Sequence, residues 1–420
     1  MNQIKRDMYL QKLINRRNNG MIKVITGLRR AGKSYLLFEL YHDYLLSTGV
    51  PDGRILRLAL DDDENEEFLD YKKLGEKVRS FIKDEKQDYY VFLDEIQFVE
   101  NFEKTVNGLN RISNLDIYVT GSNSKFLSSD IKTEFRGRGD EVQVYPLSFS
   151  EFLPACGKDK MTAWTEYCTY GGLPMVLHLE TPEQKSSYLQ NLLEHTYKRD
   201  VIEHNNIKET VVLDNLINFL ASTIGALTNP TKLAHTFQTV LKKSVSDNTV
   251  RDFIKDIKEA FLISDAERYD VKGKRYIGGN VKYYFQDLGI RNAQLNFRQF
   301  ELTHIMENII YNELLYRGYH VDVGTVEVST KDKDGNYKRV DTEIDFICNL
   351  GSDRIYIQSA FSVQDQEKSA AEQRSLLNTK DGFKKIILTQ DPVPKYKNDN
   401  GILIMNIQDF LLSPQSLNDL

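Results

Sequence analysis

The sequence predicts an α/β protein of about two to four domains, in which a three-layer core is followed by a helical region and then by a smaller α/β region. Three observations predict this fold. From Met21 to about Tyr145, apolar strand patterns alternate with helical patterns, as in a sheet covered by helices on both faces. From about Pro146 the apolar spacing becomes helical. In the last third of the chain, strand patterns return among helices.

The first predicted strand leads into a phosphate-binding signature. Met21–Thr26 is an apolar run of strand type, Gly27–Ser34 reads G-x-x-x-x-G-K-S, and Tyr35–Tyr41 has no Gly or Pro, which favours a helix. In such a P-loop the glycines let backbone N–H groups approach a polyphosphate, Lys33 reaches the β- and γ-phosphates, and Ser34 ligates Mg²⁺. The predicted nucleotide-binding residues are Gly27, Arg29, Arg30, Ala31, Gly32, Lys33 and Ser34.

A later strand ends in two adjacent carboxylates, Asp94 and Glu95, after the strand pattern at 88–93. A solvated acidic turn would give the same pattern, so the interpretation depends on the P-loop upstream. Beside a P-loop, Asp94 would complete the Mg²⁺ shell and Glu95 would polarise the attacking water. The sequence therefore predicts an ATPase whose cofactors are ATP and Mg²⁺.

Two further segments offer residues that could sense or stabilise the γ-phosphate. Ser122 and Asn123 follow the strand pattern at 115–120, although an ordinary Gly-Ser turn explains them equally well. Arg136 and Arg138 lie in a glycine-containing loop, where an arginine finger needs to be exposed and always charged. This favours Arg138 over Arg136, with a plain basic surface loop as the alternative.

Composition limits the partners and the compartment. The formal net charge is −6, so overall electrostatics does not indicate nucleic-acid binding, and local basic segments would have to provide it. The cysteines Cys156, Cys168 and Cys348 are few and scattered, which predicts no disulfide framework or zinc site. No apolar run approaches the roughly 18 residues of a membrane helix, and the N-terminus does not read as a signal peptide. We expect a soluble, cytoplasmic protein without a membrane partner.

The segment at 227–292 has the element order of a winged helix-turn-helix. An apolar helical face at 212–224 precedes it, Asn229 and Pro230 begin a first helix, and Ser246 begins a second. The strands Leu262–Tyr269 and Lys282–Phe285 follow, separated by a tip rich in Gly and Lys. Helix, helix and β-hairpin in this order predict a winged helix.

Basic residues on this segment are candidates for duplex DNA contact. Arg251 and Lys255 lie on one flank of the second helix, whereas acidic residues occupy the centre of its exposed face. The tip is more favourable, because cations cluster around its glycines. They are Lys272, Lys274 and Arg275, with Arg268 and Lys282 nearby. A winged helix that binds protein is the alternative.

The last third reads as a small α/β domain. A helix over Glu301–Tyr316 ends near Arg317-Gly318. The expected later elements are the strands 319–330, 337–349, 354–363, 383–389 and 401–405, and a helix over 364–378, with Asp334-Gly335 as a turn. The predicted domains are therefore 1–145, 146–226, 227–292 and 300–420.

Several segments occur in the order found in one family. They are Gly27–Ser34, Leu93–Gln97, Thr120–Ser122, Gly137-Arg138 before Tyr145–Phe152, Tyr170–Pro174, Arg199-Asp200 and Phe285–Gly289. Through them nearly the whole chain resembles prokaryotic AAA+ ATPases with an AAA_14-type core and a C-terminal domain of unknown function 4143. The resemblance implies an AAA+ core, a helical lid, a winged helix and a domain similar to PD-(D/E)xK, restriction-endonuclease-like nucleases. It also implies that Arg138 is the finger.

The nuclease-like site that the resemblance implies is incomplete. Such a site uses a helix Glu, a strand Asp and a following Glu-x-Lys, for which Glu307 and Asp345 could supply the first two. Gln358 stands in place of the third acid and Ala360 in place of the lysine, so we expect a catalytically inactive domain. Lys368 or Arg374 on the next helix could be a migrated cation.

Two functional hypotheses remain. The first is an oligomeric, DNA-associated AAA+ ATPase that completes its site with Arg138 from a neighbouring copy. The second is a slow nucleotide-dependent switch that works through protein contacts without DNA.

Overall fold

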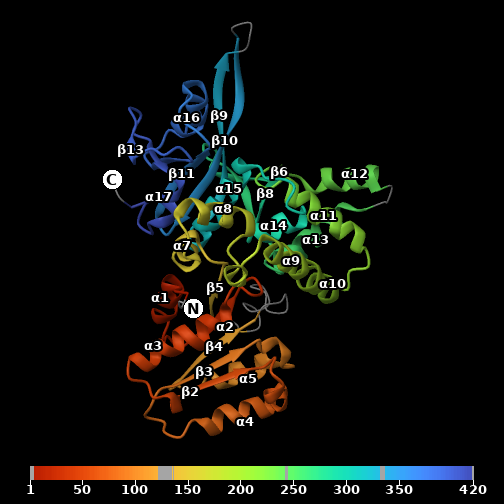
Figure 1. Cartoon of the computed structure of the whole chain (residues 1–420), viewed down its shortest axis with the longest axis vertical. Coiled ribbons are helices and arrows are strands. Elements are labelled where there is room, and N and C mark those ends of the chain that lie inside the picture. Colours follow the sequence, from red (N-terminus) through yellow and green to blue (C-terminus); the bar gives the residue numbers. More distant parts are fainter. Residues whose placement is uncertain (1–3, 122–134, 136, 242–244, 332–335, 419–420) are drawn as a thin grey trace.

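The computed structural model describes residues 4–121, 135, 137–241, 245–331 and 336–418. Two bodies are visible in Figure 1: a lower one built around a parallel sheet, and an upper one that contains the rest of the chain. The N-terminal helix α1 (Asp7–Ile14) lies against the lower body near the junction between them. Within the described residues, no helix is long and apolar enough to cross a membrane.

The lower body confirms the predicted α/β core. Its sheet has the order β2-β3-β4-β1-β5, and every neighbouring pair is parallel. Strands β1, β3 and β4 are buried along their whole length, as expected for a parallel sheet covered on both faces. The five strands are β1 (Ile22–Thr26), β2 (Ile55–Ala59), β3 (Tyr89–Asp94), β4 (Leu115–Thr120) and β5 (Gly139–Gln143). The carboxyl ends of β1, β4 and β3 therefore lie side by side at one edge.

Helices cover this sheet. The predicted helix after the P-loop forms, but its middle part, Leu36–Tyr41, has π-helical hydrogen bonding between α2 (Lys33–Tyr35) and α3 (His42–Ser47). Single π-turns inside helices often occur at functional sites. The other core helices are α4 (Tyr71–Phe81) and α5 (Phe102–Leu109).

The region after Pro146 is helical, as its apolar spacing indicates. Helix α7 begins with a capping box between Ser148 and Glu151. The helices are α7 (Phe149–Cys156), α8 (Lys160–Tyr170), the 3₁₀ turn Pro174–His178, α9 (Pro182–Leu192), the π-turn Leu193–Tyr197, α10 (Lys198–Asn205) and α11 (Thr210–Ser222). The predicted apolar face of α11 is buried.

The segment at 227–292 contains the predicted helix, helix and hairpin. Ser246 caps α13 through its side chain, and the hairpin turn at 271–274 carries the glycine and lysines. The elements are β6 (Leu227–Thr228), α12 (Pro230–Leu241), α13 (Asp247–Glu259), β7 (Ile263–Asp270), β8 (Arg275–Phe285) and α14 (Leu288–Gln294).

The last third follows the prediction closely. Its elements are α15 (Leu302–Tyr316), β9 (His320–Lys331), β10 (Tyr337–Leu350), β11 (Asp353–Ala360), α16 (Gln366–Leu377), β12 (Lys384–Thr389), β13 (Tyr396–Lys397), β14 (Leu403–Asn406) and α17 (Ile407–Leu412). The ends of β9 and β10 project as a long arm at the top of Figure 1. The predicted Asp334-Gly335 turn lies outside the described residues.

One feature was not predicted. Strand β7 pairs in parallel with β9 through Arg268–Val323, Tyr269–Gly324 and Asp270–Thr325. The hairpin β7–β8 is therefore part of a nine-stranded sheet in the order β13-β14-β12-β11-β10-β9-β7-β8-β6. The two predicted domains at 227–292 and 300–420 share this sheet.

Candidate nucleotide-binding site

The P-loop has the backbone shape that its glycines permit. Gly27 has φ +128° and Gly32 has φ +94°, values that L side chains rarely adopt. A Cβ on Gly27 would lie 2.1 Å from the carbonyl oxygen of Val144, just beyond β5. Only glycine lets the loop pass this close to the neighbouring strand.

Lys33 lies at the centre of the loop. Its side chain is buried, and its Nζ donates to the carbonyl oxygens of Gly27 at 3.0 Å and Leu28 at 3.2 Å. Burial lowers the pKa of Lys33 to about 8, while Glu95 and Asp94 act in the opposite direction. The Lys33 amine therefore interacts electrostatically with the carboxylates of Asp94 and Glu95.

The acid pair and the P-loop meet at the carboxyl edge of the sheet. Asp94 is buried and accepts a hydrogen bond from the Thr120 hydroxyl. Burial raises the pKa of Asp94, and hydrogen bonds from Thr120 and Ser34 partly offset this. The structure thus brings together Ser34, Asp94 and Thr120 from three separate segments.

Thr120 is a site residue that the sequence analysis missed. Its Oγ1 also accepts from the backbone N–H of Glu95 at 3.0 Å, so that one hydroxyl contacts both acidic residues. The signal was present, because Thr120 is the last residue of the strand beside the acidic one. Ser122 and Asn123, the predicted residues, lie outside the described part of the chain.

Glu95 has a backbone conformation that is uncommon for its type. Its φ of +51° and ψ of +47° are left-handed, and its carboxylate accepts from the side-chain amide of Gln97. Sparsely populated backbone conformations cluster at functional sites, where the surrounding structure enforces them. Here the hydrogen bond from the Glu95 N–H to Thr120 is part of that enforcement.

A cleft of about 760 Å³ opens over the loop. One side is formed by P-loop residues and Glu95, and the other by the 3₁₀ turn Pro174–His178 and by Tyr188. The Arg30 guanidinium lies 6.0 Å from the centre of the Tyr188 ring. Such a cleft has phosphate-binding groups at one end and apolar and aromatic groups at the other, which suits a nucleoside triphosphate.

The helical region also touches the P-loop directly. The Arg29 side chain pairs with Asp200 of α10 at 3.1 Å. The backbone carbonyl oxygen of Arg29 accepts a hydrogen bond from the Tyr197 hydroxyl at 2.8 Å. From the N-terminus, the buried Arg6 donates to the Ala31 carbonyl oxygen at 2.9 Å. Arg6, Tyr188 and Tyr197 belong to no local motif and were not predicted as site residues.

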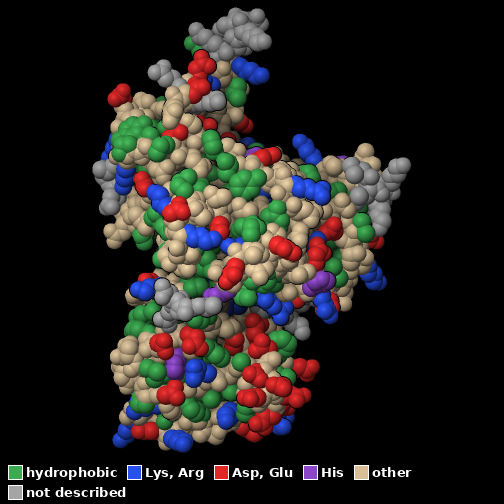
Figure 2. Space-filling model, viewed as in Figure 1, with side chains coloured by type: hydrophobic (Ala, Val, Ile, Leu, Met, Phe, Trp, Pro, Cys, Tyr) green, Lys and Arg blue, Asp and Glu red, His purple; other side chains and the backbone are tan. Residues whose placement is uncertain are grey.

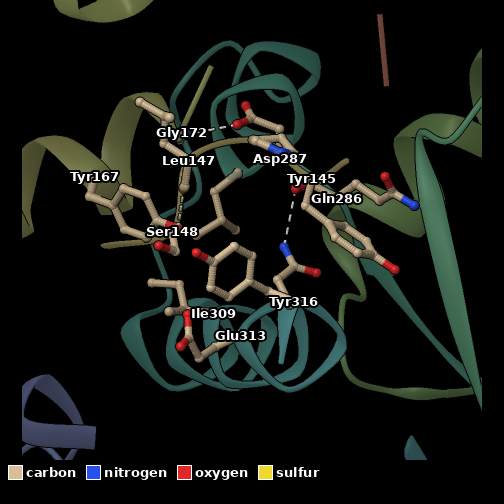
Figure 3. Close-up of a pocket in the computed structure, with 14 residues that line it drawn as sticks. Tyr145, Leu147, Ser148, Tyr167, Gly172, Gln286, Asp287, Ile309, Glu313 and Tyr316 are labelled. Carbon is tan, nitrogen blue, oxygen red and sulfur yellow. Dashed lines mark hydrogen bonds between the residues drawn. The ribbon is translucent and has the colours of Figure 1, made fainter. Parts of the chain in front are cut away.

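Two of the sequence motifs contact one another at the junction of the bodies. Figure 3 shows Asp287 pointing to Gly172, with Glu313 and Tyr316 of α15 on the opposite side. Asp287 accepts from the N–H groups of Gly172 at 2.8 Å and Ile290 at 3.0 Å. Burial raises the pKa of Asp287 to about 6, although these backbone donors act to lower it. The contact fixes the glycine pair that leads into the cleft wall at Pro174.

The AAA domain family model AAA_14 matches residues 19–153, which contain the P-loop and the acid pair. A protein of Haemophilus influenzae is 34% identical over 414 residues, covering 97% of this chain and 98% of that one. Residues 19–153 therefore belong to the AAA_14 family of AAA domains, and the chain as a whole belongs to one family with the Haemophilus influenzae protein.

Beyond the AAA_14 domain, residues 161–301 match a domain of unknown function 8612, whereas domain 4143 was expected as the C-terminal domain and is not confirmed. A protein of Methanocaldococcus jannaschii is 31% identical, covering 87% of this chain and 79% of that one. Among solved structures, a Walker-type ATPase of Pyrococcus abyssi is 14% identical and covers 70% of this chain and 96% of that one, with a TM-score of 0.49. The Aeropyrum pernix ORC1 protein in complex with DNA is 11% identical and covers 70% and 93%, with a TM-score of 0.33.

Arg138 is not near the phosphate-binding loop of its own AAA_14 domain. It directly precedes β5, and its carbonyl oxygen accepts from the N–H of Ile22 at the amino end of β1. The five residues of β5 span about 17 Å, and the P-loop lies at the other end. The Arg138 side chain is exposed, and Arg136 lies outside the described residues.

The predicted DNA-contacting cations have unequal surroundings. Arg251, Lys255, Lys274 and Arg275 are exposed, and of these Lys255 pairs with Glu259 at 3.6 Å and Arg275 with Asp270 at 3.9 Å. Lys272 is also exposed, but its amine donates to the backbone carbonyl of Glu327 on β9. On the face shown in Figure 2, acidic side chains gather over the lower body, while Lys and Arg are scattered over the upper one.

Lys282 corrects one expectation. It was predicted to lie with the exposed cations of the tip, but it is 3% exposed and faces Glu307 and Asp345. It also supplies a cation to the nuclease-like residues, a role for which Lys368 and Arg374 were named as candidates. Arg374 is exposed on α16, and the Lys368 side chain is not among those described.

The three nuclease-like residues are close together. Gln358 Oε1 accepts from the N–H of Asp345 at 3.4 Å, and Glu307 lies across Lys282 from Asp345. However, among the described residues no group of three or more His, Cys, Asp and Glu side chains is arranged to hold a metal ion. The residues present do not fit a nuclease metal.

Proposed function

We propose that this protein binds ATP and hydrolyses it with Mg²⁺ in the cleft between the P-loop and the Pro174–His178 turn. The observation that carries the proposal is the convergence of Lys33, Ser34 and Asp94 at one edge of the sheet, with Glu95 beside them. A buried lysine, a hydroxyl and a carboxylate are the groups that phosphoryl transfer from ATP requires.

Each side chain has a distinct part in this proposal. Lys33 would exchange the carbonyls of Gly27 and Leu28 for the β- and γ-phosphates. When bound, Mg²⁺ supplies positive charge at the phosphates, and Ser34 and Asp94 are the residues that would hold it. Glu95 would polarise the attacking water, while Thr120 keeps the carboxylate of Asp94 oriented.

The proposed enzyme works as an oligomer. Arg138 is too far from its own P-loop to act there, but its exposure and position at the edge of the AAA_14 domain suit a finger that enters a neighbour's site. This part of the proposal depends on Arg138 alone and is tested separately below.

Duplex DNA is the proposed partner, bound through a winged helix at 227–292. The support is the exposed set Arg251, Lys255, Lys274 and Arg275, and Asp252 on the same helix acts against it. The test is ATP turnover with and without duplex DNA across a salt series. A rate raised by DNA, with a DNA affinity that falls steeply with salt, is the expected result.

A matched pair of variants sharpens this test. Lys274→Ala with Arg275→Ala should reduce the salt dependence of DNA affinity by up to about two units of slope, one for each lost phosphate contact. Lys86→Ala, an exposed lysine on the AAA_14 domain, should leave it unchanged. If DNA does not change the rate of ATP turnover, and the protein does not bind DNA at low salt, DNA is rejected as the partner.

A series of contacts favours a second candidate, a nucleotide-dependent switch that acts through protein contacts. Arg6 bonds the Ala31 carbonyl of the P-loop and pairs with Glu151 at 3.1 Å. Glu151 in turn accepts from the Tyr316 hydroxyl of α15 at 3.0 Å. If this function holds, ATP should change hydrogen exchange in α15, turnover should be slow, and Arg6→Met should abolish the change. Fast turnover stimulated by DNA would reject it.

A further inference from the structure

Lys282 is a buried lysine among three carboxylates. Its Nζ lies 2.9 Å from Glu307 Oε1, 2.6 Å from Glu343 Oε1 and 3.7 Å from Asp345 Oδ1. The Lys282 side chain is 4% exposed, and only Glu343, at 36%, reaches solvent appreciably. We call these four residues the Lys282 cluster. Nothing in the proposed ATPase function uses it.

The cluster joins three separate elements. Lys282 comes from β8 of the hairpin, Glu307 from α15, and Glu343 and Asp345 from β10. Figure 1 shows α15 and β8 side by side in the upper body. Tyr284, two residues along β8, donates to Glu307 at 2.7 Å, and the second oxygen of Asp345 accepts from the Ser359 N–H at 2.8 Å. The carboxylates of Glu307 and Asp345 are thus held in position beside the amine.

The charges of the cluster explain how these groups tolerate burial. Three carboxylates without a cation would repel each other in a medium where desolvation is costly. Burial alone would lower the pKa of Lys282, but Glu307, Asp345 and Glu343 outweigh it and raise the pKa above its usual value. Lys282 is therefore charged at neutral pH, while burial and the neighbouring Glu307 raise the pKa of Asp345 well above its usual value.

A migrated catalytic lysine would have to leave the carboxylates free to hold a metal. Here Lys282 contacts the carboxylate oxygens of Glu307 and Asp345, the same two side chains that the nuclease-like arrangement assigns to the metal. Divalent cations need oxygen ligands at about 2.0–2.6 Å, which leaves no room for an ammonium group between the same oxygens. The amine and a metal ion exclude one another.

We propose that the Lys282 ammonium replaces the metal ion of the nuclease-like site and converts the site into a clamp that ties the β7–β8 hairpin to α15 and β10. A nuclease obtains this positive charge from a metal ion in solution, whereas here the Lys282 side chain supplies it. In an active site of this kind, a lysine lies on β11 at the position that Ala360 occupies here. In this chain the cation comes from β8 instead, and it holds the carboxylates together rather than taking part in catalysis.

The test is Mn²⁺ binding by the full-length, nucleotide-free protein, measured by electron paramagnetic resonance. In Lys282→Met the carboxylates lose their cation, and we expect one additional bound Mn²⁺ per chain, at least tenfold tighter than any binding by the parent. Lys282→Arg keeps the charge and should bind no additional Mn²⁺. Adding Asp345→Asn to Lys282→Met should abolish the new binding.

Lys23→Met is the matched control. Lys23 is also fully buried and paired, but with the single carboxylate Asp116, so that its loss leaves too few ligands for a cation. No Mn²⁺ binding is expected there. If Lys282→Met is unfolded in metal-free buffer, the proposal requires Mn²⁺ to refold it, because the metal supplies the missing charge.

Three results would overturn the proposal. One is a folded Lys282→Met protein that binds no more Mn²⁺ than the parent. Another is an unfolded one that millimolar Mn²⁺ does not restore. The third is a parent protein that already binds one Mn²⁺ and loses it in Asp345→Asn, because metal and ammonium would then coexist.

Discussion

Replacing Gly172 with alanine tests whether the glycine pair positions the wall of the nucleotide cleft. A Cβ on Gly172 would lie 2.3 Å from the carbonyl oxygen of Leu147 and 3.1 Å from its nitrogen. Non-bonded heavy atoms prefer separations of about 3.5 Å, so the two backbones would have to move apart by about 1 Å. Both contacts are to backbone, which cannot rotate away as a side chain can.

The energetic cost has two parts. Overpacking of this kind costs about 1–3 kcal/mol. The same movement stretches the 2.8 Å hydrogen bond from the Gly172 N–H to Asp287, and a hydrogen bond to a charged group is worth about 1.5–3 kcal/mol. We expect the free energy of unfolding to fall by about 3 kcal/mol or more, and ATP affinity to fall about tenfold because Pro174 and Met175 shift with the loop.

Urea unfolding and titration with a fluorescent ATP analogue measure the two effects. Gly53→Ala is the control, since its Cβ would meet no atom within 4 Å. If Gly172→Ala matches Gly53→Ala in both unfolding midpoint and ATP affinity, the proposed positioning role of the glycine pair is wrong.

Three further predictions follow from the site. Lys33→Ala should abolish tight ATP binding, whereas Glu95→Gln should bind ATP and lose hydrolysis; unchanged turnover in Glu95→Gln would reject its assignment to the water. Specific ATPase activity should rise with protein concentration, and mixing Arg138→Ala with Glu95→Gln subunits should restore part of it; no rescue on mixing argues against a finger in trans. Because the pKa of Asp287 is raised to about 6, stability from its protonated form is present below about pH 4 and is lost as the pH rises through about 6. The unfolding free energy of the parent relative to Asp287→Asn should therefore decrease by up to about 3 kcal/mol across that window, and a constant difference would contradict the burial argument.

The parts that sequence predicted well are those whose chemistry is local. The P-loop lies within eight consecutive residues, and the adjacent Asp94 and Glu95 are interpretable because that P-loop precedes them. In the last third, helices α15 and α16 and strands β9 to β12 and β14 were predicted within a few residues, because apolar periodicity is strong there. The two-residue strand β13 and the short helix α17 were not predicted. Ser246 was recognised as a helix start for the same local reason.

The parts that sequence did not predict depend on contacts between distant segments. Thr120 reaches Asp94 only because β4 lies beside β3, and Arg6 reaches Ala31 across 25 positions. Lys282 was assigned to the surface because lysines near a hairpin tip usually are. A signal existed, since Lys282 stands within the largely apolar run from Val281 to Phe285, but only the fold shows which carboxylates face it.

The parallel pairing of β7 with β9 sets the limits within which the protein can be divided. A chain shortened at residue 300 would leave the N–H and C=O groups of β7 unpaired along one edge, and such an edge recruits other chains. The β7–β8 hairpin and residues 300–420 should instead unfold together in one cooperative transition, because each covers the strand edge at which β7 pairs with β9. A chain divided before residue 227 keeps the pairing of β7 with β9 intact.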